Sequence, residues 1–330
     1  MTQQMVRNVK IIGTGSYVPE EIRDNHWFER VGSSDEWIST NLGIKQRHIV
    51  AEGELTSDMA AKAGKRAIEQ AGLKPEDIDL VILSTFTPDR KAPSTAAITV
   101  TKLGMENAAA FDLNATCAGS VVSYATGAQF IATSMYQNVL VISSEVCSTV
   151  LDWTRRDCCF LGDGAGACVL SASNSDEGFL HFDINANGVD KDIVTVKAGG
   201  VELPVTQEVI NSGQQYWYMN GREVYNQATV RIPESIIKSL NACGLTAEDV
   251  DHVIPHQPGK GMLSKVSENV GVPWEKFRTN YQKYANTSSS TIPIMLDECN
   301  RDGLLKQDDI IVFGTIGGGM TWASAVYKCG

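Results

Sequence analysis

The feature that most constrains the fold of this 330-residue chain is an internal repeat. Residues 72–82 (GLKPEDIDLVI) match residues 244–254 (GLTAEDVDHVI) at a constant offset. Each copy follows an amphipathic pattern, at residues 60–71 and 235–243, which ends at a glycine as helices commonly do. Each copy then continues through an acidic turn into a short apolar run typical of a strand. A duplicated strand–helix unit predicts two mixed α/β halves packed about a pseudo-twofold axis.

A second pair of segments extends the repeat. Residues 138–144 correspond to residues 309–313, and a glycine-rich stretch follows each copy. We therefore predict that the chain divides into one half over residues 1–175 and another over residues 176–330. Because ligand clefts commonly form between structural units, the functional site is expected where the halves meet.

Bulk composition fits a soluble globular protein. Hydrophobic residues make up 43% and charged residues 20% of the chain, which is long enough to bury a large core. No apolar run has the length of a membrane span, and the N-terminus lacks the plan of a signal peptide. The net charge of −11 disfavours general binding to nucleic acid or to anionic membranes. We predict a cytoplasmic protein.

The eight cysteines are scattered without paired spacing, and no Cys/His pattern typical of a metal site is present. Reduced thiols in a cytoplasmic protein are the simplest interpretation, and we predict no metal site.

Cys117 is the most informative single residue. It lies in residues 111–119 (FDLNATCAG), an apolar run with small residues that predicts a strand, a sharp turn and a helix over residues 120–133. A thiol at the first turn of a helix faces free backbone N–H groups and the positive end of the helix dipole. Both are expected to lower its pKa, as a nucleophile requires. The alternative is a small buried apolar residue, which is the usual role of an unpaired cysteine.

Two later segments supply partners for a cysteine nucleophile. His256 follows a short apolar strand, and Asn286 opens a polar loop whose hydroxyl residues suit helix capping. An imidazole can hold or move a proton near neutral pH, and a carboxamide donates a hydrogen bond without carrying charge. Cys, His and Asn together suit acyl-thioester chemistry, in which an oxyanion or enolate is stabilised. Singly, a histidine at a strand end and an Asn-Thr-Ser helix start are commonly structural.

With these residues the chain resembles the β-ketoacyl-[acyl-carrier-protein] synthase III family of condensing enzymes. The resemblance implies a thiolase-like α/β fold, with two pseudo-symmetric halves in five αβαβα layers, and a homodimer. The matching motifs run along the whole chain, at residues 10–19, 33–38, 43–48, 111–119, 162–167, 255–257, 286–288 and 317–322.

The resemblance also implies a reaction. Cys117 takes an acyl group from acyl-CoA, malonyl-acyl carrier protein loses carbon dioxide, and its enolate attacks the acyl-cysteine. His256 and Asn286 are expected to donate hydrogen bonds to the malonyl thioester oxygen. The backbone N–H groups of Cys117 and Gly318 are expected to form the oxyanion hole. Acyl-CoA and malonyl-acyl carrier protein are thus the expected partners, and no cofactor is implied beyond the CoA thioester substrate.

Further positions match the family's substrate contacts. Trp37 and Arg156 match residues that sandwich the CoA adenine, although the choice between Arg155 and Arg156 stays open. Asn41 replaces an arginine that contacts phosphate in the family. Because acyl carrier proteins are acidic, docking on this acidic chain needs a local basic patch, for which we predict Lys260 and Lys265.

Departures from the family pattern cluster around the acyl pocket. Phenylalanines line it in acetyl-primed members, one of them supplied across the dimer interface, and the matching residues here are Ala92, Leu161 and Ile316. Smaller side chains predict a wider pocket and a primer bulkier than acetyl: medium-chain, branched or aromatic. Gly259 and Ala285 also replace an asparagine and a glycine of the family. These changes keep open a role in specialised metabolism, priming a polyketide or alkylquinolone-type product or transferring acyl groups to oxygen or nitrogen.

Other classes fit less well. A degradative thiolase needs a second cysteine in the C-terminal glycine-rich segment, and Cys329 lies beyond it. A 3-hydroxy-3-methylglutaryl-CoA synthase needs a glutamate close to the nucleophile, and none is expected near Cys117. An acyl hydrolase and an inactive partner subunit are the remaining alternatives.

Overall fold

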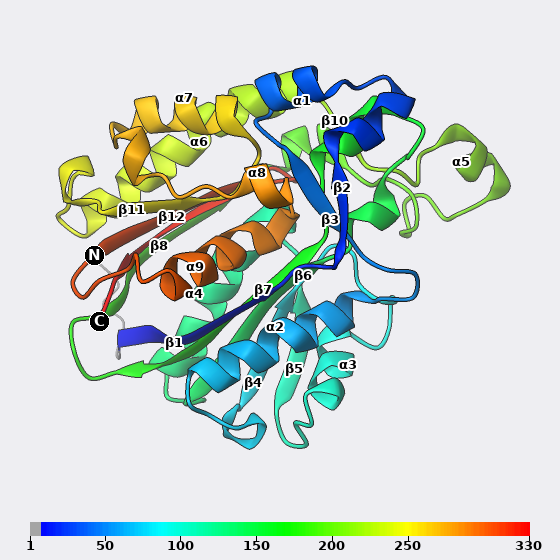
Figure 1. Cartoon of the computed structure of the whole chain (residues 1–330). Helices are drawn as coiled ribbons and strands as arrows, with labels where there is room; N and C mark the ends of the chain where they lie inside the picture. The colour runs from blue at the N-terminus through cyan, green and yellow to red at the C-terminus, as the bar shows by residue number, and fades with distance from the viewer. Residues whose placement is uncertain (1–7) are drawn as a thin grey trace.

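Two β-sheets form the framework of the computed structural model, which describes residues 8–330 (Figure 1). The strands of the larger sheet, in spatial order, are β1 (Asn8–Tyr17), β7 (Gly164–Ser173), β6 (Asn138–Glu145), β4 (Leu80–Ser84) and β5 (Ala109–Leu113). Strands β6, β4 and β5 run parallel to one another, whereas β7 is antiparallel to both of its neighbours, β1 and β6.

The smaller sheet belongs to the second half of the chain. Its strands, in spatial order, are β11 (His252–Pro255), β12 (Ile310–Gly317), β13 (Thr321–Lys328) and β8 (Gly178–Ala186). Strands β11 and β12 are parallel, and the other two neighbouring pairs are antiparallel.

The sequence repeat is visible in the structure at the offset found in the sequence. The first residues of β11 and β4 are separated by the same number of positions as those of β12 and β6. The starts of helices α9 (Thr291–Arg301) and α4 (Gly119–Ala132) have this separation as well. The order β8-β13-β12-β11 therefore repeats the order β1-β7-β6-β4, with β5 as an additional edge strand. The predicted pair of pseudo-symmetric α/β halves is confirmed.

Helices cover both faces of both sheets, so that the molecule has the five αβαβα layers that were expected (Figure 1). Helix α2 (Thr56–Gln70), together with α3 (Thr95–Lys102), covers the outer face of the larger sheet. Helices α4 and α9 form the central layer and contact strands of both sheets. Helix α6 (Gly221–Ala242) covers the outer face of the smaller sheet, and α7 (Lys260–Val270) packs against it.

The central layer explains the unusual composition of α4. This helix carries no charged residue, because most of its surface is buried between the two sheets. Gly127 lets the helix approach the larger sheet closely, since a Cβ there would lie 3.1 Å from Leu170 and 3.2 Å from Val139. On its other side Tyr124 joins Phe179 and Phe313 in the main apolar cluster.

The remaining elements gather at one end of the layers. They are β2 (Glu21–Asp24), the 3-10 segment η1 (Asn25–Val31), α1 (Asp35–Asn41), β3 (Gln46–Ile49) and α8 (Tyr281–Tyr284). The long connection between β8 and α6 adds β9 (Val194–Thr195), α5 (Gln207–Ser212) and β10 (Tyr218–Met219). Helix α5 projects furthest from the body of the molecule (Figure 1). No helix within residues 8–330 combines the length and apolar character of a membrane span.

The two halves share one interface rather than forming separate bodies. Helix α9 of the second half packs against β1 and β7 of the first, and α4 packs against β12 and β13. The larger sheet ends at Ser173 and the smaller one begins at Gly178. The division at residue 175 falls between these strands and stays a prediction.

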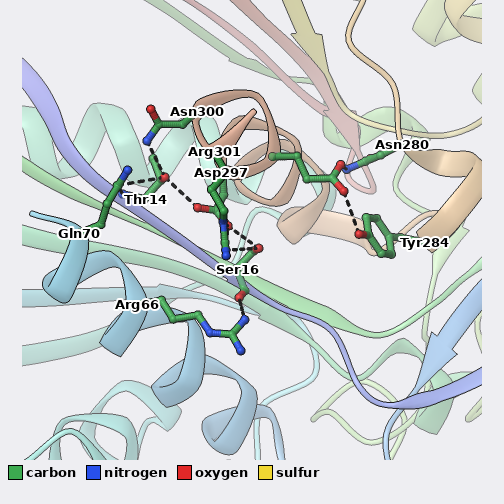
Figure 2. A network of polar contacts seen from close by, with 10 residues as sticks. Thr14, Ser16, Arg66, Gln70, Asn280, Tyr284, Asp297, Asn300 and Arg301 are labelled. Carbon is green, nitrogen blue, oxygen red and sulfur yellow. Dashed lines mark hydrogen bonds and ion pairs between the residues drawn. The ribbon is translucent and has the colours of Figure 1, made fainter. Parts of the chain in front are cut away.

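A buried polar network fastens this interface (Figure 2). Asp297 of α9 is 1% exposed, and its carboxylate accepts hydrogen bonds from Thr14 Oγ1 at 2.8 Å and from Ser16 Oγ, both on β1. Arg301, one turn further along α9, forms an ion pair with the same carboxylate. Arg66 of α2 donates to the backbone oxygen of Ser16. One carboxylate therefore joins the central layer to the first strand of the larger sheet.

We expect Asp297→Asn to lower the free energy of unfolding by about 2 kcal/mol, because hydrogen bonds to a buried charged acceptor are lost. Arg301 is half exposed and can turn to water, which limits the cost. Urea unfolding measures the change. The matched control is Asp176→Asn, which removes the exposed ion pair of Asp176 with Lys328 and is expected to leave the free energy of unfolding nearly unchanged. Equal changes in the two variants would contradict the role assigned to the network.

Candidate active site

Cys117 lies in the 3-10 turn η3 (Thr116–Ala118), which links β5 to the N-terminus of α4. The turn is sharp because Thr116 has a φ of +47°, an uncommon conformation for a β-branched residue. The predicted strand, sharp turn and helix are therefore present, with the helix beginning at Gly119. Cys117 therefore lies beyond the C-terminal end of β5, where η3 contacts β12 of the second half.

The second half holds η3 in place through backbone and hydroxyl contacts. Thr315 Oγ1 of β12 donates to the backbone oxygen of Cys117 at 2.9 Å, and Thr116 Oγ1 donates to the backbone oxygen of Gly318 at 3.1 Å. A Cβ on Gly317 would lie 2.7 Å from the backbone nitrogen of Cys117, so only glycine permits this approach. The segments of Cys117 and Gly318, the predicted donors of the oxyanion hole, are thus in contact, and that role stays a prediction.

His256 is buried just beyond β11, where its backbone N–H donates to the oxygen of Gly314 at 2.9 Å. Its ring Nδ1 is 2.9 Å from Thr291 Oγ1, which leaves Nε2 as the ring nitrogen available to a substrate. Burial lowers the pKa of His256 to about 4, although the backbone of Ser288 opposes this. The imidazole is therefore neutral at pH 7.

Asn286 is held by backbone contacts with the segment before β7. Its N–H donates to Phe160 at 3.2 Å, and its backbone oxygen accepts the N–H of Gly162 at 3.0 Å. Its side-chain Oδ1 accepts the backbone N–H of Ser288 at 2.7 Å. Because the oxygen of the amide is engaged, its Nδ2 is the side that can donate to a ligand.

The three predicted side chains meet around Ser288, the first residue of the 3-10 turn η9 (Ser288–Ser290). Ser288 Oγ is 3.5 Å from Cys117 Sγ, and its N–H binds Asn286. Thr291, which contacts His256, donates its hydroxyl hydrogen to the backbone oxygen of Ser288 at 3.0 Å. The sequence predicted only helix capping for the hydroxyl of Ser288. The signal that could have identified its place in the site is its position two residues after Asn286.

The predicted lowering of the pKa of Cys117 is wrong in direction. All eight cysteines are free thiols, but burial raises the pKa of Cys117 to about 11. The hydrogen bond with Ser288 opposes this rise, and the charge of Glu145 adds to it. The position at a helix N-terminus was visible in the sequence, whereas the loss of water around the thiol was not. The resting thiol is therefore protonated, and attack on an acyl group needs a proton acceptor.

A glutamate does lie close to Cys117, contrary to expectation. Glu145, the last residue of β6, is completely buried, and its Oε1 is 3.4 Å from Ser288 Oγ. The sequence signal was a single acidic residue at the end of an otherwise uncharged strand. It was missed because residues 145 and 117 belong to different segments that only the fold brings together.

Trp37 and Arg156 stack on one another. The guanidinium carbon of Arg156 lies 4.3 Å from the centroid of the Trp37 ring, and Phe160 packs against the same tryptophan. These residues line a pocket of about 560 Å³ together with Arg155 and Asp157. Arg155 forms an ion pair with Asp157 at 2.7 Å, so Arg156 is the arginine that faces the ring. Adenine binding at this pair stays a prediction.

The three predicted pocket residues have different surroundings. Leu161 is 3% exposed and forms a bridge with Asn286. Ile316 is also 3% exposed and immediately precedes Gly317. Ala92 lies in the exposed loop between β4 and α3. Leu161 and Ile316 therefore adjoin the segments of Asn286 and Gly317, whereas Ala92 is exposed to solvent.

The two lysines predicted to meet the carrier protein lie on α7. Lys260 is its first residue, and Lys265 forms an exposed ion pair with Glu268 at 2.8 Å. Gly259, just before the helix, has a φ of +134°, a conformation that other residues rarely adopt. Glycine, which replaces the family's asparagine at this position, is therefore the residue that the local backbone conformation favours.

The glycine-rich stretch that begins at Gly162 continues directly into a strand. Strand β7 starts at Gly164, and a Cβ on Gly166 would lie 2.7 Å from the backbone nitrogen of Ile294. The glycines therefore allow α9 to pack closely on this strand. Asp163 accepts backbone N–H groups of Val50 and Ser148 and is structural.

Comparison with known proteins agrees with this geometry. Profiles described as 3-oxoacyl-[acyl-carrier-protein] synthase III and its C-terminal domain match residues 111–188 and 240–329. A β-ketoacyl-[acyl-carrier-protein] synthase III of Caldanaerobacter subterraneus is 43% identical over 320 residues, covering 96% of this chain and 97% of the relative. The chain belongs to the β-ketoacyl-[acyl-carrier-protein] synthase III family. The resemblance found in the sequence is confirmed, and the chain is an acyltransferase of this family with a thiolase-like fold.

Solved structures of the family superimpose on the whole chain. The Aquifex aeolicus 3-oxoacyl-[acyl-carrier-protein] synthase III gives a TM-score of 0.90 at 36% identity and covers 97% of this chain and 99% of its own. The priming β-ketosynthase of the R1128 polyketide biosynthetic pathway also gives a TM-score of 0.90, at 26% identity, covering 98% of this chain and 96% of its own.

Ala285 departs from the family's glycine at a position where the backbone favours glycine. Its φ of +56° and ψ of −149° cost a non-glycine residue roughly 1–3 kcal/mol. Since glycine adds freedom to the unfolded chain worth about 0.5–1 kcal/mol, Ala285→Gly should raise the free energy of unfolding by about 1 kcal/mol. Urea unfolding tests this. Ala61→Gly inside α2 is the control and should lower the same quantity by about 1 kcal/mol, and a loss of that size in Ala285→Gly would contradict the strain.

Proposed function

We propose that this enzyme condenses an acyl-CoA primer with malonyl-acyl carrier protein through an acyl-Cys117 intermediate. The observation that carries the proposal is the convergence of Cys117, His256 and Asn286 on Ser288. The thiol contacts its hydroxyl, the amide of Asn286 accepts its backbone N–H, and the imidazole is linked to its backbone oxygen through Thr291. The first substrate and the carrier partner follow from the family.

In the first step the sulfur of Cys117 attacks the thioester carbon of acyl-CoA. A tetrahedral oxyanion forms, and the backbone N–H groups of Cys117 and Gly318 are the proposed donors to it. The bond from carbon to the CoA sulfur then breaks, and CoA leaves as a thiol with the proton that Cys117 gave up. Loss of one oxyanion donor commonly costs a factor of about 100–1,000 in rate.

In the second step malonyl-acyl carrier protein replaces CoA. Asn286 Nδ2 and His256 Nε2 donate to the malonyl thioester oxygen, so that the electron pair released with carbon dioxide is held as an enolate. For Nε2 to carry the hydrogen of the neutral ring, Thr291 turns its hydroxyl hydrogen from the oxygen of Ser288 to Nδ1 of His256. The enolate carbon attacks the acyl group, the bond to Cys117 Sγ breaks, and the β-ketoacyl product leaves on the carrier protein. The released thiolate takes a proton from water and returns to the resting thiol. A neutral imidazole suits this role because it can donate without the cost of a buried charge.

Substrate entry is proposed at the pocket of Trp37 and Arg156, where an adenine ring would lie between the indole and the guanidinium. The pair is stacked at 4.3 Å, so the guanidinium must move away for a ring to enter between them. Lys260 and Lys265 are the proposed contacts of the acidic carrier protein. No resident cofactor is needed, because CoA enters and leaves as part of the substrate.

The primer is proposed to be bulkier than acetyl. Leu161 adjoins Asn286 and Ile316 adjoins the glycine-rich turn, so both are close to where the acyl group must lie. Ala92 would complete the pocket from the partner subunit of a homodimer. Each methylene accommodated contributes about 0.8 kcal/mol of burial, which favours longer or branched primers where phenylalanine is absent.

A specialised pathway is the second candidate. The same pocket changes favour it, as does the likeness to a polyketide-priming ketosynthase. In that case the enzyme would prime a polyketide or alkylquinolone-type product. Acyl transfer to oxygen or nitrogen is less well supported, because the free amide of Asn286 is suited to holding an enolate.

Variants should separate the two half-reactions. Cys117→Ala is expected to abolish acylation by acyl-CoA and product formation together. His256→Ala and Asn286→Ala should still form the acyl-enzyme but lose about 100-fold or more in condensation with malonyl-acyl carrier protein. Rapid-quench mass spectrometry and product assay measure the two steps. Wild-type condensation in the Asn286→Ala enzyme would contradict the proposed role of the amide.

Primer size is tested with acetyl-CoA, butyryl-CoA and octanoyl-CoA. Acylation of the wild type is expected to be faster with octanoyl-CoA than with acetyl-CoA. Ala92→Phe should slow the octanoyl reaction at least about tenfold and leave the acetyl reaction unchanged, because the loop is exposed and the ring would refill the pocket. Equal rates with acetyl and octanoyl groups in the wild type, or a preference for acetyl, would show that the pocket is not widened.

A further inference from the structure

Glu145 is a completely buried carboxyl group that no step above uses. Its Oε2 accepts hydrogen bonds from Thr87 Oγ1 at 2.8 Å, from Thr85 Oγ1 at 3.1 Å and from the backbone N–H of Phe86 at 3.1 Å. Its Oε1 accepts from Ser289 Oγ at 2.7 Å. Within residues 8–330 it forms no ion pair. A carboxyl group without a cation is costly to bury in its charged form, so its retention beside the nucleophile needs an explanation.

A chain of hydroxyl contacts links this carboxyl group to the nucleophile. Ser288 Oγ is 3.5 Å from Cys117 Sγ and 3.4 Å from Glu145 Oε1. Ser288 has one hydroxyl hydrogen and two lone pairs, so it can donate to the carboxylate while accepting from the thiol. Its φ of +54° is unusual for a serine and holds the hydroxyl between the two groups. The contacts are long, as those of unliganded enzymes often are.

We propose that Glu145, acting through Ser288, accepts the proton that leaves the Cys117 thiol when the acyl group is transferred. The thiol proton moves to Ser288 Oγ while the serine proton moves to Glu145 Oε1. The sulfur electron pair forms the bond to the acyl carbon, and the bond from that carbon to the CoA sulfur breaks. The proton returns by the same route to the departing CoA thiolate, so that CoA leaves as a thiol and Glu145 is again a carboxylate.

The acid–base character of the carboxyl group suits this task. Burial raises the pKa of Glu145 to about 7, and the hydrogen bonds of Ser289 and Thr87 oppose the rise. A proton acceptor works best when its pKa lies near the working pH. His256 is the competing acceptor, but burial lowers its pKa to about 4, so the two bases predict different pH profiles.

Few titratable groups face Glu145. The thiols of Cys117 and Cys147 approach it from η3 and from the turn after β6, and the pKa of each is raised in part by its charge. Strand β4 and η9 present hydroxyls, and α4 carries no charged residue. Asp163 precedes β7, while Asp58 of α2 pairs with Lys102 of α3 near the surface. In the described part of the chain, no neighbouring cation masks the titration of Glu145.

The test is the pH dependence of acylation alone, followed from pH 5.5 to 9 by rapid quench and intact-protein mass spectrometry with acetyl-CoA and octanoyl-CoA. In the wild type the rate should rise about tenfold per pH unit and level off near pH 7. Ser288→Ala removes the hydroxyl between thiol and carboxyl group, and Glu145→Gln removes the proton acceptor. Each should lower the acylation rate about 100-fold or more and abolish the plateau of the pH profile.

Ser289→Ala is the matched variant, because it removes a hydrogen bond to Glu145 without touching the thiol contact. That hydrogen bond lowers the pKa of Glu145, so the variant should keep the plateau and shift its midpoint to higher pH. A purely structural carboxyl group would give no such shift. If Glu145→Gln does not fold, as thermal unfolding would show, the two serine variants decide the question.

This inference rests on the proposed acylation of Cys117, and the two can fail separately. Loss of all adduct in Cys117→Ala with wild-type pH profiles in Ser288→Ala and Ser289→Ala would leave the proposed function intact and overturn the relay. A wild-type rate that stays level from pH 5.5 to 9, as a base with a pKa of about 4 would give, or a pH dependence abolished by His256→Ala alone, would assign the proton to the imidazole. Full acylation of a Cys117→Ala chain would overturn the proposed function itself.

Discussion

The structure depends on the contact of the Cys117 turn with the second half of the chain. Thr315 holds the backbone of Cys117, Thr116 holds that of Gly318, and Gly317 has no side chain so that the two segments can touch. Neither half contains a complete set of site residues. The five-layered arrangement brings the site segments together, because the 3-10 turns that precede the two central helices, η3 before α4 and η9 before α9, contact each other.

Burial sets the charge state of the site. Loss of water raises the pKa of the Cys117 thiol and of the Glu145 carboxyl group and lowers that of the His256 imidazole. Each shift favours the neutral form of its group, as expected where no cation or metal compensates a buried charge. In the proposed relay a proton moves over a short distance without a permanent buried charge beside the thiol, and Ser288 is placed to connect the thiol with the carboxyl group.

Much of the fold was predictable from the sequence because the repeat consists of apolar patterns and helix-ending glycines. These are local signals, since each depends only on neighbouring residues. The offset of the repeat pairs β4 with β11, β6 with β12 and α4 with α9. The meeting of Cys117, His256 and Asn286 followed from the motifs. Ser288 and Glu145 were missed because these two residues lie far apart in the sequence and only the fold brings them together. The pKa of Cys117 was misjudged because a sequence does not display desolvation, and the strain at Ala285 depends on a φ angle that only the structure gives.

The central claim is that Cys117 holds the primer and passes it to malonyl-acyl carrier protein. The most direct measurement is a pulse with acyl-CoA, followed by a chase with malonyl-acyl carrier protein and peptide mapping of the eight cysteines by mass spectrometry. The account predicts one acyl group per chain, on the peptide with Cys117, that disappears as an equal amount of β-ketoacyl-carrier protein forms. An acyl group on another cysteine, or one that persists while product forms, would contradict it.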